Sequence, residues 1–443
     1  MKVARLPVDP GASGWSALLP AQPAPDRLED AITADWLIIG GGFAGLAAAR
    51  RLAQLHPGTR IALLEATRIG EGPAGRNSGF MIDLPHDLAS ESYAGAEQGD
   101  AAQTRANRAA IAFAAEMAAE FGLTAEAFAP TGKVNAAAGD KGHRHNLDYA
   151  AHLAGLREAH EMLDADAMRE MTGTRYYRSG LFTPGTVMIQ PALFVRGVAK
   201  GLAGAGVRIF EDSPVTGLSR DGAWGAQTPR GSVVAPRVIL AVNGHAESFG
   251  QFRGRLLHVF TYASMTRALT TDEVRALGGA ARWGVTPADP MGTTVRRISG
   301  TGGDRIIIRN RFTHDPAMQV SQRRIARVGR DHDRAFAARF PMLAGVGMEY
   351  RWGGRLCLSW NGAPALGEVA PGLFAACCQN GLGVAKGTLH GMLMAELASG
   401  QSSDLLREVL AQPAPRRLPP APLTYLGANA TMRWGEWTAG REF

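Results

Sequence analysis

The stretch "DWLIIGGGFAGLAAARRLAQ", residues 35–54, decides the fold of this chain. It carries Gly40, Gly42 and Gly45 in the order G-x-G-x-x-G, after a short apolar run and before an alanine-rich run of helix-forming composition. A glycine trio alone is a weak signal in a chain with 55 glycines among 443 residues. Its neighbours must decide whether these glycines hold a dinucleotide or only form a turn.

The surrounding residues predict a strand, a helix and a second strand. "WLIIG" has strand length and enters the glycines directly, Pro57 and Gly58 end the helix, and "RIALLEA" reads as the second strand. Glu65 ends that strand 20 positions after Gly45, where an acid can bind the two ribose hydroxyls of a nucleotide. We therefore predict a dinucleotide site, and the acid favours FAD or NAD over NADP.

Each glycine has its own task in such a site. Gly40 permits the tight turn, Gly42 lets the backbone approach the pyrophosphate, and Gly45 lets helix and strand pack closely. The helix N-terminus, with Phe43 and Ala44, presents free N–H groups and a partial positive charge to the phosphates.

Length and composition restrict the class of protein. A chain of 443 residues suggests two domains, and its 46% apolar and 20% charged residues fit a soluble globular protein. No apolar run approaches the roughly 18 to 20 residues of a membrane span, and we see no secretory signal, so we expect no membrane partner. The three cysteines cannot form a disulfide framework, which points to a cytoplasmic protein.

The net charge of +7 is carried by scattered arginines. The densest basic stretch, "QRRIARVGRDHDR", also holds two aspartates, and we interpret it as a solvated helix face. No basic and aromatic patch is visible, so a nucleic-acid partner is not expected. No metal-ligand spacing occurs, and the oligomeric state stays open.

The loop after the acid carries a family resemblance. "PAGRNSG", from Pro73 to Gly79, resembles a loop of the D-amino-acid oxidase superfamily of FAD-dependent oxidoreductases, which includes glycine oxidase, sarcosine oxidase and the glutamylputrescine oxidoreductases. The segments 188–218, 235–250 and 350–400 are similar to further flavin-binding segments of that family. The resemblance implies FAD as the cofactor. Cys357 lies near the position through which some relatives attach flavin, but out of register, so we expect noncovalent FAD.

The motif and the resemblance together nominate the cofactor contacts. They are Gly40, Gly42, Phe43, Ala44, Gly45, Glu65, Ala66, Gly75, Arg76, Asn77, Ser78, Val215, Asn243, Gly244, Gly381, Leu382, Gly383, Lys386, Gly387 and Thr388.

The resemblance also implies an α/β fold, α+β overall. A Rossmann-like FAD-binding domain would be interleaved with a smaller substrate domain on a mainly antiparallel sheet. We assign 34–90, 186–250 and 345–410 to the first domain and 91–185 and 251–344 to the second. We read residues 1–33 and 411–443 as extended terminal segments.

The family's chemistry implies the function. A hydride passes from the carbon beside an amine nitrogen to flavin N5, the imine hydrolyses, and O2 is reduced to H2O2. A secondary amine or N-substituted amino acid of the sarcosine, iminodiacetate or glutamylputrescine type is the expected substrate. The alternatives are a dehydrogenase that passes electrons to a quinone or a protein partner, and a tRNA-modifying flavoenzyme.

Substrate-side residues are less readable from the sequence. A substrate carboxylate favours an arginine fork, and Arg309 and Arg311 would share one face of the strand "RIIIRNRF". His258 and Tyr262 would share a face of a second strand, as substrate contacts or as half-buried sheet residues. Lys386 completes the predicted catalytic set, with a surface lysine as its alternative.

Overall fold

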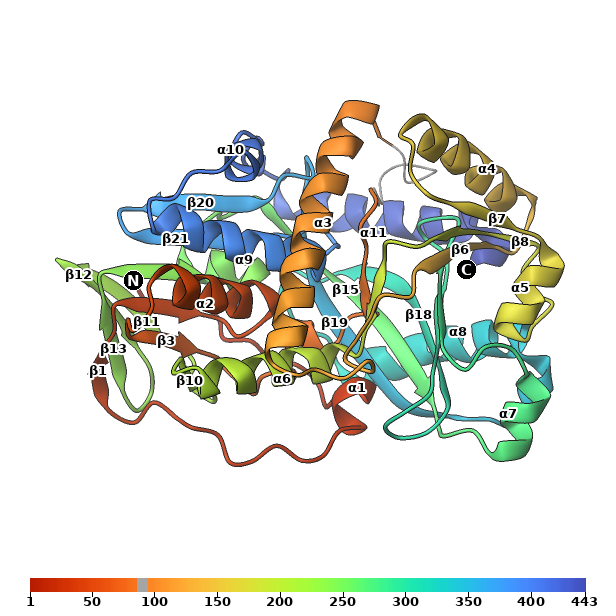
Figure 1. The fold of residues 1–443 in the computed structure, drawn as a ribbon, viewed down its shortest axis with the longest axis horizontal. Coiled ribbons are helices and arrows are strands. Elements are labelled where there is room, and N and C mark those ends of the chain that lie inside the picture. The colour runs from red at the N-terminus through yellow and green to blue at the C-terminus, as the bar shows by residue number, and fades with distance from the viewer. Residues whose placement is uncertain (86–94) are drawn as a thin grey trace.

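A computed structural model describes residues 1–85 and 95–443 of the chain. The predicted domain boundary at residue 90 lies outside the described residues. Figure 1 shows two halves, with the first strands and helices of the chain on the left and a large sheet on the right. No helix among the described residues is long and apolar enough to cross a membrane.

The glycine motif lies where the sequence predicts it. β2 (Trp36–Ile39) enters the glycines, α2 (Phe43–Leu55) follows them, and β3 (Ile61–Leu64) pairs with β2 in parallel. Every residue of both strands is buried, because helices or a second sheet cover both of their faces.

A six-stranded sheet extends this unit in the order β10-β3-β2-β14-β21-β20. Its pairs are parallel except for the edge strand β20. Alternate residues enter two separate cores. The added strands are β10 (Arg208–Phe210), β14 (Arg237–Leu240), β20 (Ala365–Ala370) and β21 (Leu373–Cys377).

Each face of this sheet has its own cover. On one face Ile38 and Leu63 pack with residues of α2, α3 (Glu97–Glu120), α6 (Pro191–Gly204) and α9 (Ala385–Ala398). On the other face Leu37 and Leu64 pack with a four-stranded sheet. That sheet has the order β1-β13-β12-β11, formed by Ala31–Thr33, Ser232–Ala235, Ala223–Gln227 and Gly217–Asp221.

The large sheet has eight strands and is mainly antiparallel, with one parallel pair between β16 and β6. Its order is β19 (Met348–Ser359), β15 (Leu256–Thr266), β18 (Arg305–His314), β17 (Thr294–Ile298), β16 (Trp283–Pro287), β6 (Lys133–Ala137), β8 (Ser179–Thr183) and β7 (Glu161–Leu163). The mixed α/β class and the antiparallel second sheet agree with the sequence prediction. Strand β19 belongs to this sheet, although the sequence placed 345–410 with the dinucleotide-binding segments.

Shorter elements complete the fold. A three-stranded sheet consists of β4 (Phe80–Met81), β9 (Val187–Ile189) and β5 (Phe128–Ala129). The remaining helices are α1 (Gly14–Ala17), α4 (Asp140–Gly155), α5 (Ala165–Thr172), α7 (Thr271–Leu277), α8 (Gln322–Arg339), α10 (Asp404–Leu410) and α11 (Ala421–Thr438), and the 3-10 segments are η1 (Pro73–Gly75), η2 (Asn243–Phe249), η3 (Pro341–Leu343) and η4 (Gly440–Glu442).

The prediction of an extended C-terminal segment is wrong for its second half. Prolines keep residues 412–420 out of regular structure, but α11 begins directly after Pro420. Proline suits the start of a helix because the first N–H groups need no partner within it. The sequence prediction extended the effect of the prolines too far along the chain.

Candidate functional site

A cavity lies between the six-stranded and the eight-stranded sheet. Its volume is about 1660 Å³, which includes the solvent-filled space at its mouth. It begins at the carboxyl ends of β2 and β3, where open parallel sheets place their ligands. The structure brings to it the predicted residues Gly40, Gly42, Phe43, Ala44, Glu65, Ala66, Arg76, Asn77, Ser78, Val215, Asn243, Gly381, Gly383 and Gly387, and on the opposite wall Tyr262 and Arg309.

The glycine motif forms one end of this cavity. Gly40 has φ +105°, and a Cβ on Gly45 would lie 1.8 Å from the Gly40 carbonyl oxygen, so both positions require glycine. A Cβ on Gly42 would meet only Ala74, at 3.6 Å, and would otherwise project into the cavity. Gly42 caps α2 without a side-chain hydrogen bond, which leaves the first N–H groups of the helix for an anion. This cradle fits a pyrophosphate.

The acid at the end of β3 is held by the same turn. The Glu65 carboxylate accepts hydrogen bonds from the Gly41 N–H at 2.8 Å and from the Thr67 N–H at 3.0 Å. Burial raises the pKa of Glu65 above its usual value. A carboxylate fixed beside the cradle fits the ribose of a bound nucleotide.

The loop from Arg76 to Gly79 is fixed by side chains from distant parts of the chain. Trp15 Nε1 donates to the Asn77 carbonyl at 2.8 Å, and Arg296 Nη1 donates to the Ser78 and Gly79 carbonyls at 3.1 and 3.0 Å. The Arg296 guanidinium is buried, and its burial lowers its pKa to about 9. Sequence reasoning found the loop but not this arginine, which lies in an ordinary strand pattern.

The first nine residues form a wall of the cavity that the sequence did not predict. Val3, Arg5, Leu6, Pro7 and Asp9 line it, and we call residues 1–13 the N-terminal strap. The strap begins beside the four-stranded sheet, where the Val3 N–H donates to the Thr216 carbonyl at 2.9 Å. No motif in the sequence marks this segment, so no local signal could have found it.

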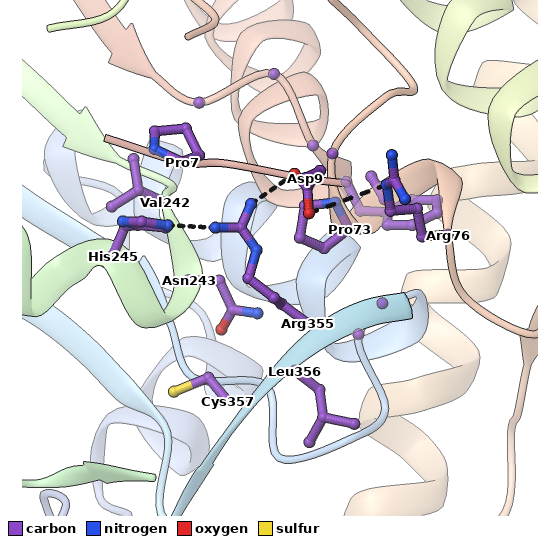
Figure 2. Close-up of a pocket in the computed structure, with 18 of the residues that line it drawn as sticks. Pro7, Asp9, Pro73, Arg76, Val242, Asn243, His245, Arg355, Leu356 and Cys357 are labelled. Carbon is purple, nitrogen blue, oxygen red and sulfur yellow. Dashed lines mark hydrogen bonds and ion pairs between the residues drawn. The ribbon is translucent and has the colours of Figure 1, made fainter. Parts of the chain in front are cut away.

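The strap is held by a buried ion-pair cluster, drawn in Figure 2. Asp9 Oδ2 lies 2.7 Å from Arg355 Nη2, and Asp9 Oδ1 lies 4.0 Å from Arg76 Nε. Arg355 Nη1 donates to His245 Nε2 at 2.6 Å. Burial, reinforced by Arg355, lowers the pKa of His245 to about 3, so this imidazole is neutral and can accept that bond.

Arg76 lines the cavity, but its guanidinium faces protein carbonyls. Its Nε donates to the Glu71 carbonyl at 2.6 Å and another nitrogen donates to the Gly11 carbonyl. Only 1% of the side chain is exposed, and burial lowers its pKa. The residue therefore anchors the strap to the loop.

Several nominated cofactor residues lie behind the cavity wall. A Cβ on Gly75 would meet the Gly70 carbonyl oxygen at 1.8 Å, which gives Gly75, like Gly45, a packing role. The Thr388 hydroxyl donates to the Val384 carbonyl of its own helix at 2.8 Å. Leu382, Lys386 and Gly244 also do not line the cavity.

The two arginines predicted to share a face are separated by a β-bulge. The pairing of β18 with β15 skips Arg311, whose φ is +64°. Arg311 therefore turns to the other face of the sheet, where it pairs with Asp331 and Glu436. Arg309 stays on the cavity side, with its guanidinium 4.5 Å from the Phe312 ring centre.

His258 and Tyr262 differ in their relation to the cavity. His258 Nε2 lies 2.7 Å from a Glu247 oxygen, outside the cavity. The Tyr262 hydroxyl pairs with Thr313 Oγ1 at 2.7 Å, its ring packs in a core with Phe260, and burial raises its pKa to about 12. Both side chains are buried, at 7% and 1% exposure, and Tyr262 still lines the cavity, so its role as a substrate contact stays a prediction.

Thr261, which the sequence analysis did not nominate, lies beside Tyr262 on the cavity wall. It lines the cavity, and its buried Oγ1 has no hydrogen-bond partner among the described residues. It lies on the same wall as Arg309, because β15 and β18 pair side by side. The pairing of β15 with β18 shifts register between Thr261 and Tyr262, and sequence alternation alone does not show such a shift.

Cys357 also lines the cavity, at the end near Asn243. Its side chain is buried in the core with Cys378, and this neighbour together with burial raises the pKa of the Cys357 thiol well above its usual value. The thiol is therefore protonated, a state of low nucleophilicity.

The cradle, the fixed acid and the cavity beneath a second sheet define a dinucleotide-dependent oxidoreductase. The profile of the FAD-dependent oxidoreductase family matches residues 35–397, and the chain belongs to this family. It is 27% identical over 420 residues to a protein of Rhizobium meliloti named "Probable oxidoreductase OrdL", covering 90% of this chain and 91% of the relative. It is 26% identical over 404 residues to gamma-glutamylputrescine oxidoreductase of Escherichia coli, covering 85% and 86%.

Solved structures agree on the fold. Glycine oxidase from Geobacillus kaustophilus superposes with a TM-score of 0.69 at 20% identity, over 87% of this chain and 99% of that one. Iminodiacetate oxidase from Chelativorans superposes with a TM-score of 0.67 at 18% identity, over 86% and 100%. The predicted family, fold, enzyme class and FAD dependence are thus confirmed.

Proposed function

We propose that this enzyme oxidises the C–N bond of a secondary amine or N-substituted amino acid that carries a carboxylate. The observation that supports it most is the cavity itself, which places Arg309 and Thr261 on the wall facing the cradle. A guanidinium is well suited to a carboxylate. The substrates for which three relatives are named, glutamylputrescine, glycine and iminodiacetate, each carry both an amine and a carboxylate.

The residues that would hold FAD follow from the same geometry. The α2 N-terminus and Gly42 would take the pyrophosphate, Glu65 the ribose, and Val215 would pack beside the adenine. Bound there, noncovalently, FAD would supply the hydride acceptor. The protonated, buried Cys357 supports the noncovalent mode.

The remaining chemistry belongs to the protein side of the cavity. Arg309 would fix the substrate carboxylate and so orient the carbon that loses hydride. The Thr261 hydroxyl would hydrogen-bond the substrate, since its oxygen has no partner among the described residues. The strap and the large sheet would exclude bulk water. No general base is required if the amine binds neutral.

The test compares substrates with and without a carboxylate. Wild-type enzyme is mixed anaerobically with a panel of amines and amino acids, and loss of flavin absorbance near roughly 450 nm identifies the substrates. Arg309→Met should raise KM for carboxylate-bearing substrates roughly 10- to 100-fold, the worth of a charged hydrogen bond. Arg309→Lys, the matched control, should lose less, because it keeps the charge without the fork.

Two results would contradict the proposal. One is an unchanged KM for every carboxylate substrate in Arg309→Met, and the other is bleaching only by amines that lack a carboxylate. Peroxide formed in air during turnover separates an oxidase from a dehydrogenase. We expect peroxide in equal amount to the oxidised substrate.

A further inference from the structure

Helices α8 and α11 both pack against β18, on the face of the large sheet that turns away from the cavity. Arg311 of β18 joins them, because it pairs with Asp331 of α8 and with Glu436 of α11. At the end of α8, Arg339 donates to the Glu442 carbonyl just after α11, at 3.0 Å. Figure 1 shows both helices on the half of the molecule that holds the large sheet. The residues that both helices turn away from the sheet therefore lie on the same side of the molecule.

The outer side of α8 carries a row of exposed arginines. Arg323, Arg327, Arg330 and Arg334 follow one another at intervals of four, three and four, which places them on one line of a helix. Arg334 pairs with Asp331, and the other three form no ion pair with a described residue. This row is the basic stretch that stands out in the sequence.

The outer side of α11 carries an exposed apolar stripe. Leu423, Leu426, Ala430, Trp434 and Trp437 recur at intervals of three and four, so they share one face. The exposed fractions of Leu423 and Leu426 are 64% and 66%, and those of Trp434 and Trp437 are 66% and 72%. The two indole rings lie 5.1 Å apart. A continuous exposed apolar stripe of this kind marks a binding surface.

The exposed charges of the C-terminal segment itself have one sign. The acids after residue 410 are Glu436 and Glu442, both buried, at 4% and 3% exposure. The arginines of the same segment are exposed, namely Arg416, Arg417, Arg433 and Arg441. A positive rim beside an apolar stripe with tryptophans complements a surface that is anionic outside and apolar beneath.

We propose that α8 and α11 form a docking surface for a lipid bilayer that contains anionic lipids. The arginine row would bind headgroups, while the leucines and tryptophans of α11 would enter the boundary between headgroups and acyl chains. A second copy of the chain fits this surface less well, because a symmetric contact would bring the arginine rows of the two copies close together, and their charges would repel. Docking of this kind needs no spanning helix, and it goes beyond the proposed function.

The test measures binding of the flavin-loaded enzyme to vesicles by flotation. Vesicles of phosphatidylcholine mixed with phosphatidylglycerol should carry the enzyme, vesicles of phosphatidylcholine alone should carry much less, and added salt should release it. Arg327→Gln with Arg330→Gln should weaken binding roughly 30-fold, at about fivefold per arginine. Trp434→Ser with Trp437→Ser should weaken binding at least as much.

A charge-matched control keeps the result specific. Arg230→Gln with Arg275→Gln removes the same charge from two exposed positions elsewhere, one in the turn between β12 and β13 and one on α7. This variant should bind vesicles like wild type. All variants should keep the flavin content and solution activity of wild type, since none of these residues lines the cavity. Equal loss in the control pair would reduce the effect to net charge and overturn the proposal.

A second outcome would overturn it as well. If anionic vesicles fail to carry the wild type, the stripe has another occupant. Sedimentation of the lipid-free enzyme would then identify a second copy, as a dimer that Trp434→Ser with Trp437→Ser dissociates.

Discussion

Asp9→Asn removes the only carboxylate that the described residues place between Arg76 and Arg355. The exposed side-chain fractions of Asp9, Arg355 and Arg76 are 8%, 9% and 1%, so the variant removes a buried counter-charge that both guanidinium groups share. Breaking a buried ion pair from one side costs about 3 kcal/mol or more. The strap is a terminal segment held by few backbone bonds, so we expect it to detach locally while the rest of the chain stays folded.

A cost of about 3 kcal/mol raises the detached fraction roughly 150-fold. Amide hydrogen exchange at Val3 and Ala4 measures the detached fraction of the strap, because their N–H groups donate to the Thr216 and Ser248 carbonyls at 2.9 Å. Their exchange in flavin-loaded enzyme should accelerate by up to that factor. FAD should also dissociate faster, because the strap forms a wall of the cavity.

Asp30→Asn is the matched control, since Asp30 is an exposed aspartate of the same N-terminal region and forms no ion pair with a described residue. It should leave exchange at Val3 and Ala4 unchanged. Wild-type exchange and wild-type FAD release in Asp9→Asn would refute the reasoning, because the cluster would then contribute nothing to holding the strap.

Two further predictions concern the cradle and the C-terminus. Gly42→Ala should lower the free energy of unfolding by at most about 1 kcal/mol but fail to retain FAD. Gly45→Ala should also lower the melting temperature of the apoprotein, because its Cβ would meet the Gly40 carbonyl oxygen at 1.8 Å. Burial raises the pKa of Glu442 from 4.5 to about 7, so the folded chain binds a proton there that the unfolded chain releases. Stability should therefore fall by up to about 3 kcal/mol as pH rises from about 4.5 to 7, and denaturant titrations across this range should be flatter for Glu442→Gln.

The sequence predicted the parts of the site that depend on local chemistry. The turn at Gly40 and the close contact at Gly45 impose their residue types within a short stretch, so the pattern is visible without a fold. The position of Glu65 could be predicted because the length of one helix and one strand sets the distance along the chain from Gly45 to the acid. The alternation of apolar residues likewise predicted β15 and β18 as strands.

The parts that failed depend on long-range geometry. A single bulge at Arg311 reverses the face of that residue, and no residue type marks a bulge in advance. Thr261 and Tyr262 both line the cavity although they are neighbours in β15, and the register shift between them is not visible in the sequence. The Asp9–Arg355 pair joins residues 346 positions apart, and nothing in either local sequence points to the other.

The central claim is that the cradle at α2 binds FAD. The most direct measurement is calorimetric titration of the apoprotein with FAD, with NADP as the comparison and Gly42→Ala as the blocked variant. We expect one FAD per chain, released unmodified by acid, with no binding of NADP and none of FAD to the variant. A wild-type chain that stays colourless and gives no heat with FAD, or a variant that binds FAD as tightly as wild type, would contradict it.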